Sequence, residues 1–389
     1  MRLTIKLLLL EVFLTSCTNP LLNATPTSLR YQPITSTVTT VATFTGVPTP
    51  TTTPTTMPPE IKISLDDNYT LLEGFSEHVT SLAWSGDGKT LFIVPPGQKH
   101  LVLFDVQGKK ITIVPVSNSV ITHIILSPDK KTLAAITSTM DYITVHFMNV
   151  ETSKIINTIS IELPPIYINN GATRLVNYGT GTFAPNGKTF ILSSGTQITL
   201  WDIESGSRMK ELFKCDPNFF IRGLFVNSAK NMVVTFYYHD WYKEKTFLGW
   251  DTNTWELTKT INGNELADYT DFAFSPDGNT FATTDVGKEI NVWDSNTFTK
   301  SLTITSSQTI GFLQTLGVAY DPSGKYIAIS DRSGVIAIYN ANTGEIVRQL
   351  VGGFEAVVLE FSPDGTKLAA GGVSGERPGQ VKIWDFSQP

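Results

Sequence analysis

Few side chains in this sequence have the chemistry of catalysis or metal binding. The 389 residues include 5 His and 2 Cys. His78, His100, His146 and His239 do not have the spacing of metal ligands, so we expect no metal or haem cofactor. Nothing adjacent to Cys215 would activate its thiol, which favours a small packed or loop residue over a nucleophile.

His123 and Asp271 are the remaining candidates for a catalytic pair. Each stands four residues before the first residue of a turn, Ser127 and Ser275 respectively, in equivalent segments of a repeated pattern. The two segments are three repeats apart, so we do not expect the two side chains to touch.

Cys17 has a different chemistry. Arg2 and Lys6 precede a short apolar run that ends in LTSC at residues 14–17, which is the layout of a signal peptide. These four residues resemble the bacterial lipobox, which implies that residues 1–16 are removed and that the Cys17 thiol receives a lipid. An ordinary signal peptide with an unrelated cysteine is the alternative, and it would also export the chain.

Residues 17–59 carry this cysteine and a segment rich in Thr and Pro. Residues 18–59 contain 15 Thr and 8 Pro, and Arg30 is their only charged residue. Such a composition cannot bury a core, so we expect a disordered stalk. At about 3.1 Å per residue it could reach up to roughly 130 Å. A disordered leader without a spacing role would have the same sequence.

Residues 60–389 are repetitive. Residues 274–278 and 361–365 both read FSPDG, and looser copies occupy the same place in five other segments. Asp and Gly suit a tight turn, because Asp bonds the nearby backbone and Gly tolerates positive φ. Each copy therefore indicates a strand end followed by a turn.

A second marker follows each turn, an aromatic or large apolar residue before Asp or Asn. Successive markers lie 44, 53, 49, 43, 46 and 45 residues apart, close to the period of a four-stranded propeller blade. We expect the large residue to pack against a neighbouring blade and the polar residue to cap a turn. The first residues of the seven pairs are Phe104, Met148, Trp201, Trp250, Trp293, Tyr339 and Trp384.

These turns and markers make residues 60–389 similar to the WD40-repeat family. With 41% hydrophobic and 16% charged residues, the chain also has the composition of an all-β protein. The resemblance implies an all-β, seven-bladed β-propeller of four-stranded antiparallel blades. The last segment lacks an outer strand and residues 69–74 supply a spare one, so we predict that the N-terminal strand completes the last blade.

Loop lengths suggest which face of such a propeller binds a partner. The turns after the innermost strands and after the markers are short and share one face, while most long connections lie on the other. Trp241 and Tyr242, beside His239, lie at a hairpin tip, and Tyr167 lies in a long insertion. Aromatic residues are common interface anchors, so these four are the candidate partner-binding residues. Packing of the neighbouring strand aromatics between blades is the alternative reading of this segment.

The sequence therefore favours a binding scaffold over an enzyme. We expect a monomer, anchored by lipid outside the cytoplasmic membrane or on an outer membrane, that binds a protein, glycan or peptide. A net charge of −6 without basic clusters argues against nucleic acid. The alternative is a propeller enzyme, lactonase-like or quinoprotein-like, with its active site at the channel mouth; residues 340–344, NANTG, faintly resemble a quinoprotein repeat.

Overall fold

The structure is a computed structural model that describes residues 61–387, apart from 66–67, 76–78, 96, 140, 164–178, 195–196, 215–218, 240–243, 263–268, 286–288, 306–314 and 375–376. All of the described residues belong to one compact unit, Ile61–Pro389. Their regular structure consists of strands and one 3-10 turn, Ser228–Lys230. No helix in this described part has the length and apolar character needed to cross a bilayer.

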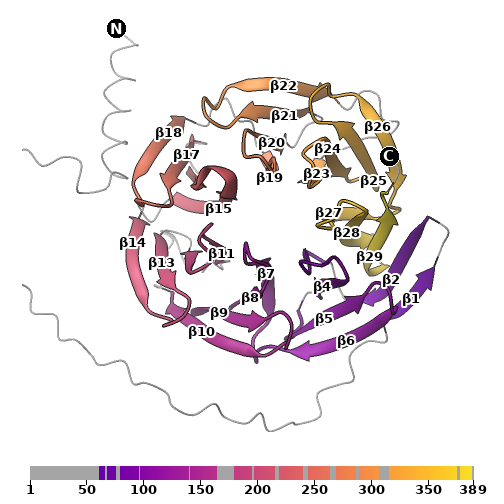
Figure 1. Cartoon of the computed structure of the whole chain (residues 1–389), viewed down its shortest axis with the longest axis horizontal. Coiled ribbons are helices and arrows are strands. Elements are labelled where there is room, and N and C mark those ends of the chain that lie inside the picture. Colours follow the sequence, from indigo (N-terminus) through magenta and orange to yellow (C-terminus); the bar gives the residue numbers. More distant parts are fainter. Residues whose placement is uncertain are drawn as a thin grey trace, which may run out of the picture. The chain divides into compact units, whose positions relative to one another are not determined.

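The strands form seven antiparallel sheets arranged as blades around a central axis (Figure 1). Blade 1 contains β3 (Ser81–Trp84), β4 (Thr90–Val94), β5 (His100–Asp105) and β6 (Lys110–Pro115). Blade 2 contains β7 (Ile121–Leu126), β8 (Thr132–Ser138), β9 (Tyr142–Asn149) and β10 (Ile155–Glu162). Blade 3 contains β11 (Thr180–Phe183), β12 (Thr189–Ser193), β13 (Gln197–Asp202) and β14 (Arg208–Lys214). Blade 4 contains β15 (Phe219–Asn227), β16 (Met232–His239), β17 (Glu244–Asp251) and β18 (Leu257–Asn262).

The remaining blades continue this order. Blade 5 contains β19 (Tyr269–Phe274), β20 (Thr280–Asp285), β21 (Glu289–Asp294) and β22 (Lys300–Thr305). Blade 6 contains β23 (Thr315–Tyr320), β24 (Tyr326–Asp331), β25 (Val335–Asn340) and β26 (Ile346–Val351). Blade 7 contains β27 (Glu355–Phe361), β28 (Lys367–Ser374), β29 (Arg377–Asp385), β2 (Tyr69–Phe75) and β1 (Lys62–Leu65). The predicted all-β, seven-bladed propeller is confirmed.

The core lies between the blades. A middle strand such as β12, TFILS, is buried at every position, because neighbouring blades cover both of its faces. Phe147 of blade 2 packs edge to face against Phe183 and Phe190 of blade 3, with ring centroids 6.0 and 5.2 Å away. An outer strand such as β6 instead has only exposed and half-buried positions.

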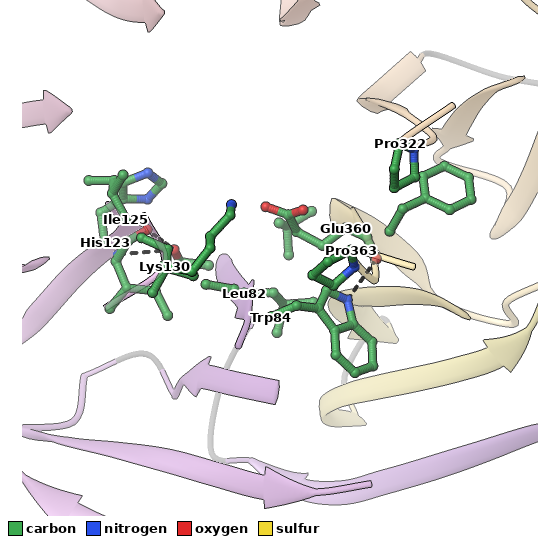
Figure 2. Close-up of a pocket in the computed structure, with 14 residues that line it drawn as sticks. Leu82, Trp84, His123, Ile125, Lys130, Pro322, Glu360 and Pro363 are labelled. Carbon is green, nitrogen blue, oxygen red and sulfur yellow. Dashed lines mark hydrogen bonds between the residues drawn. The ribbon is translucent and has the colours of Figure 1, made fainter. Parts of the chain in front are cut away.

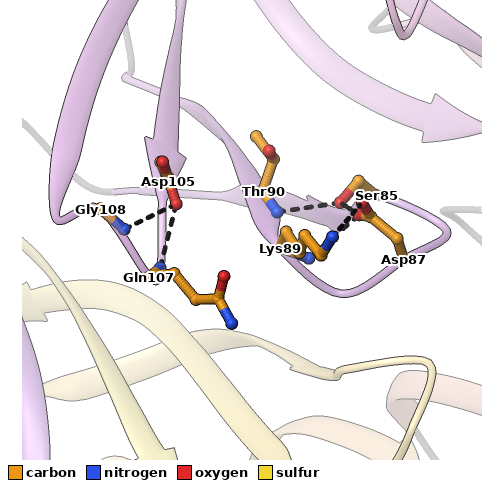
Figure 3. A network of polar contacts seen from close by, with 7 residues as sticks. All are labelled: Ser85, Asp87, Lys89, Thr90, Asp105, Gln107 and Gly108. Atoms are coloured by element: carbon orange, nitrogen blue, oxygen red, sulfur yellow. Dashed lines mark hydrogen bonds and ion pairs between the residues drawn. The ribbon is translucent and has the colours of Figure 1, made fainter.

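The marker pairs have the structural role predicted for them. Trp250, Tyr339 and Trp384 are at most 3% exposed. The polar residue that follows accepts hydrogen bonds from the backbone of the next turn, as Asp105 does from the N–H groups of Gln107 and Gly108 at 3.0 and 2.9 Å (Figure 3). Each marker therefore anchors one strand end and fixes the turn into the outer strand.

The turns after the innermost strands are built from Ser and Asp. In blade 1, the Ser85 hydroxyl donates to Asp87 and accepts from the Thr90 N–H, while Asp87 also accepts from the Lys89 N–H (Figure 3). The same bonds recur in blades 2, 5 and 7. Because the strands of a blade alternate in direction, these turns and the marker turns lie at one end of the propeller. This end is called the turn face, and the opposite end the loop face.

The N-terminal strand closes the ring as predicted. β2 pairs with β29, with Tyr69 opposite Trp384, and its Leu72 and Phe75 are completely buried. The buried Lys382 of β29 donates from Nζ to the Gly352 carbonyl at 2.6 Å and lies over the Tyr69 ring. Closure thus joins the two ends of the described chain by both backbone pairing and side-chain contacts.

Blade 7 differs from the predicted four strands. β1 adds a fifth, pairing with β2 over its whole length from Lys62 opposite Glu73 to Leu65 opposite Thr70. Ile63 packs against the same core cluster as Leu72 and Phe75. Neither a turn signal nor a marker accompanies this strand, so the repeat pattern gave no sign of it.

Candidate functional site

The central channel holds a pocket of about 530 Å³ between blades 7, 1 and 2, reaching towards blade 6 (Figure 2). It runs from the middle of the innermost strands to the turn face. Apolar side chains form most of its wall, and the polar side chains in it come from separate blades. The apolar lining includes Leu82, Trp84, Ile125, Leu126, Pro322, Val358, Phe361 and Pro363, and the ionisable lining is His123, Lys130 and Glu360.

Glu360 is the acidic group of this pocket. It stands near the end of β27, where Trp84 of blade 1 fixes its backbone by donating from Nε1 to the Glu360 carbonyl at 3.1 Å. Its carboxyl group points into the pocket (Figure 2) and has no hydrogen-bond partner among the described residues. Desolvation raises the pKa of Glu360 to about 7; the positive charge of Lys130 opposes the rise and the negative charge of Asp271 adds to it.

Lys130 is the basic group and belongs to the innermost turn of blade 2. Its φ of 61° is left-handed, at the position where five other blades have glycine: Gly88, Gly187, Gly278, Gly324 and Gly365. Its side chain extends towards the same open space as the Glu360 carboxyl group (Figure 2). No ion pair within 4 Å joins the two described side chains, so the charges face each other across a gap.

His123 also borders the pocket, deeper in the channel (Figure 2). The His123 side chain is exposed to the channel, and the blades of the ring enclose the channel. This enclosure lowers the pKa of His123 by desolvation, so the imidazole is neutral at pH 7. A neutral imidazole can accept one hydrogen bond from a ligand and donate another.

Asp271 does not pair with His123, as the spacing of their repeats implied. Its carboxylate accepts from the N–H of Phe272 at 2.9 Å and from the N–H of Val318, in the next blade, also at 2.9 Å. Desolvation nevertheless raises the pKa of Asp271 to about 6. Ser81 makes the equivalent bridge from blade 1 to the Ile124 backbone of blade 2. Ser81 and Asp271 therefore each join two adjacent blades from this position, and the hypothesis that His123 and Asp271 form a catalytic pair has no geometric support.

The partner-binding candidates of the loop face lie outside what the structure describes. Residues 164–178 and 240–243 contain Tyr167, Trp241 and Tyr242, and the leader with Cys17 lies in residues 1–60. His239 ends β16, where its backbone pairs with Phe219 and Glu244, but its side chain is outside the description. These residues stay predictions.

Sequence reasoning missed Lys130 and Glu360, although both leave a signal. Aligned by strand register, the other six residues at the Glu360 position are uncharged: Ala83, Ile125, Thr182, Phe225, Ala273 and Ala319. Lys130 occupies the position that is glycine in five other turns; in the blade 4 turn the aligned residue is Lys230, but there the left-handed residue is the next one, Asn231. One charge at an otherwise uncharged position of a repeat is the sign that could have located the pocket. No group of three His, Cys, Asp or Glu side chains within the described ranges is placed to hold a metal ion.

Comparison with known families finds a match to the WD domain, G-beta repeat, over residues 255–294. This segment runs from just before β18 to the end of β21, so it combines the outer strand of blade 4 with the three inner strands of blade 5. The sequence repeat is therefore staggered by one strand against the blade. The same stagger places β2 of the N-terminal end in blade 7.

Three curated proteins are similar to parts of the chain. The meiotic recombination protein rec14 of Schizosaccharomyces pombe is 34% identical over 101 residues, which are 26% of this chain and 32% of that protein. The WD repeat-containing protein SL1-17 of Schistosoma mansoni is 30% identical over 149 residues, 36% of this chain and 44% of that protein. Protein tipD of Dictyostelium discoideum is 22% identical over 283 residues, 71% of this chain and 42% of that protein. The chain thus spans less than half the length of each relative.

A solved structure has the same fold. Hydrazine synthase of Kuenenia stuttgartiensis superimposes with a TM-score of 0.64 at 15% identity, covering 80% of this chain and 97% of that chain. At a sequence identity this low, the similarity shows a shared fold and gives no information about activity. Taken together, the blade topology, the staggered repeat and these relatives describe a seven-bladed β-propeller whose blades resemble those of WD-repeat proteins.

Proposed function

We propose that this chain is a lipid-anchored scaffold outside the cytoplasmic membrane, whose propeller binds a partner protein, glycan or peptide. The observation that carries the proposal is the closed ring of WD-type blades, which holds its connecting loops on a rigid frame. WD-repeat propellers suggest protein-interaction scaffolds, because a closed ring presents many variable loops on fixed strands. Anchoring by Cys17 rests on the LTSC sequence at residues 14–17.

Replacement Cys17→Ser tests the anchor. The hydroxyl cannot form the thioether that the lipobox implies, so we expect the variant to move from the membrane fraction to the soluble fraction of the cell. Fractionation followed by immunoblotting measures the change, and thermal unfolding should be the same as for the parent protein. The matched control is Cys215→Ser, which removes the other thiol and should leave the protein in the membrane. Retention of Cys17→Ser in the membrane to the parental extent would exclude a lipid on this residue.

The double replacement Trp241→Ala with Tyr242→Ala tests the loop face. Loss of two aromatic anchors is expected to weaken partner capture at least tenfold, a change of about 1.4 kcal/mol in binding free energy. Crosslinking in intact cells followed by mass spectrometry identifies the partner and measures its recovery. Tyr142→Ala is the control, because Tyr142 is 47% exposed and begins β9 at the loop end of another blade. If recovery drops with Tyr142→Ala and not with the double variant, the site lies at blade 2 instead of blade 4.

A further inference from the structure

The innermost turns touch one another around the turn face through proline and glycine. A Cβ atom built on Gly324 of blade 6 would lie 3.5 Å from Cδ of Pro276 in blade 5, and one built on Gly365 of blade 7 would lie 3.6 Å from Cδ of Pro322 in blade 6. Gly88 and Gly187 contact a proline of the preceding blade in the same way, at 3.8 and 4.0 Å. The regular junction therefore places a proline against the left-handed glycine of the next turn.

At the junction between blades 1 and 2, other residues stand in place of both the proline and the left-handed glycine. The proline position of blade 1 is Gly86, and the glycine position of blade 2 is Lys130. A Cβ atom on Gly86 would come within 2.7 Å of the Lys130 Cβ and 3.2 Å of its Cγ. Gly86 thus provides the space in which the lysine side chain begins, and Lys130 accepts a backbone conformation that favours glycine. The paired exchange costs conformational energy and directs an ammonium group towards the channel.

The Lys130 side chain faces Glu360. Among the seven blades, Glu360 is the one charged residue at its position. The Lys130 and Glu360 side chains approach the same space from blades 2 and 7 without forming an ion pair (Figure 2). Trp84, which lies between them in the ring, holds the Glu360 backbone through its indole N–H. Two opposite charges held apart over an apolar wall are suited to a ligand that carries both complementary charges.

We propose that this turn-face pocket binds a free α-amino acid, with its carboxylate on Lys130, its ammonium group on Glu360 and an apolar side chain against Leu82, Ile125 and Val358. A simple anion would leave Glu360 unpaired and bring a second negative charge beside it. A simple cation would be repelled by Lys130. A zwitterion pairs both groups at once, and a pocket of about 530 Å³ is within the usual range for small-molecule sites.

The proposal is independent of partner binding at the loop face. The pocket opens at the opposite end of the propeller, and its failure would leave the scaffold function untouched. A bound ligand would also explain why the Glu360 carboxyl group lies in a desolvated site without a partner among the described residues. In this site its pKa is raised to about 7. The ammonium group of the ligand would supply the charge that Glu360 lacks.

Isothermal titration of the purified full-length chain tests the proposal. The probes are L-leucine, L-isoleucine, L-methionine and L-phenylalanine, together with 4-methylpentanoate and isoamylamine as the carboxylate-only and amine-only analogues of leucine. We expect one of the four amino acids to bind with one site per chain, and both analogues to bind at least tenfold more weakly than leucine. Absence of saturable binding by all four amino acids, or equal binding of leucine and 4-methylpentanoate, would overturn the proposal.

Two variants place the site at these residues. Lys130→Gly restores the residue that five other blades use, so the variant should fold at least as well as the parent and bind the amino acid at least tenfold more weakly. Glu360→Gln should weaken amino-acid binding to the same extent while 4-methylpentanoate binds no more weakly than to the parent. Asn231→Gly is the control, since it relieves another left-handed residue, φ 48°, in a turn outside the pocket and should leave affinity unchanged. Parental affinity in both Lys130→Gly and Glu360→Gln would show that the pocket is not the site.

Discussion

Replacing Phe75 by alanine is expected to lower the free energy of unfolding by about 3 to 5 kcal/mol, the usual cost of removing a fully buried phenylalanine. Phe75 is completely buried in the cluster that also contains Leu72 and Val381, at the seam between blade 7 and blade 1. Its strand, β2, supplies the pairing that joins the N-terminal end of the described chain to β29. The cavity left by the substitution would therefore weaken ring closure as well as local packing.

Urea unfolding followed by tryptophan fluorescence measures this effect. Val351→Ala is the matched control, because Val351 lies in an outer strand and is 75% exposed, so its truncation should change stability by less than about 0.5 kcal/mol. A closure defect should also appear as faster proteolysis of β1 and β2 under native conditions. Equal unfolding midpoints for the two variants would mean that β2 contributes little to closing the ring.

The variant Glu360→Gln should be more stable than the parent protein at pH 8, by about 1 to 3 kcal/mol, and equal to it near pH 4. Desolvation raises the pKa of Glu360 in the folded protein to about 7 from an ordinary value of 4.5. The folded state therefore holds this proton more tightly than the unfolded chain does. Between about pH 4.5 and pH 7, the free energy of unfolding of the parent protein therefore falls as the pH rises. Well above pH 7 this contribution falls no further.

Glutamine does not ionise, so the variant lacks this part of the pH dependence. Asp271, whose pKa is also raised, to about 6, contributes a fall between pH 3.8 and 6 in both proteins; only its repulsion of ionised Glu360 is absent from the variant. Urea midpoints of both proteins at pH 4, 6 and 8 provide the test. A stability difference that is the same at all three pH values would show that Glu360 is not held in a desolvated site. A stability gain on removing a charge is typical of a residue kept for function instead of folding.

Much of the fold was predictable because the same local sequence pattern recurs along the chain. The Ser and Asp turns and the marker pairs depend on hydrogen bonds within a few residues, as at Ser85 and Asp87 or at Asp105 and Gly108, so local sequence is enough to identify them. The spacing of the markers gave the number of blades, and the missing outer strand at the end gave the closure by β2. β1 was not predicted, because this added fifth strand has no counterpart in the other blades.

The candidate site was less predictable because its parts are distant in the chain. Lys130 and Glu360 are brought to one pocket only by the curvature of the ring, which sets blades 7, 1 and 2 side by side. Asp271 was noticed in the sequence for its possible chemistry, yet the structure assigns its carboxylate to the backbone of the next blade. Whether an acidic side chain faces a ligand or an amide depends on which strand packs beside it.

By itself the sequence determined the all-β class, the seven repeats, their turns and the strand that closes the ring, since each of these follows from short-range patterns repeated along the chain. Only the tertiary structure decided which polar residues meet: it paired the Asp271 carboxylate with the N–H of Val318, placed Lys130 opposite Glu360, and showed that Gly86 leaves space for the Lys130 side chain. The physical reason is that contacts between blades join residues far apart in the chain, and only closure of the ring specifies them.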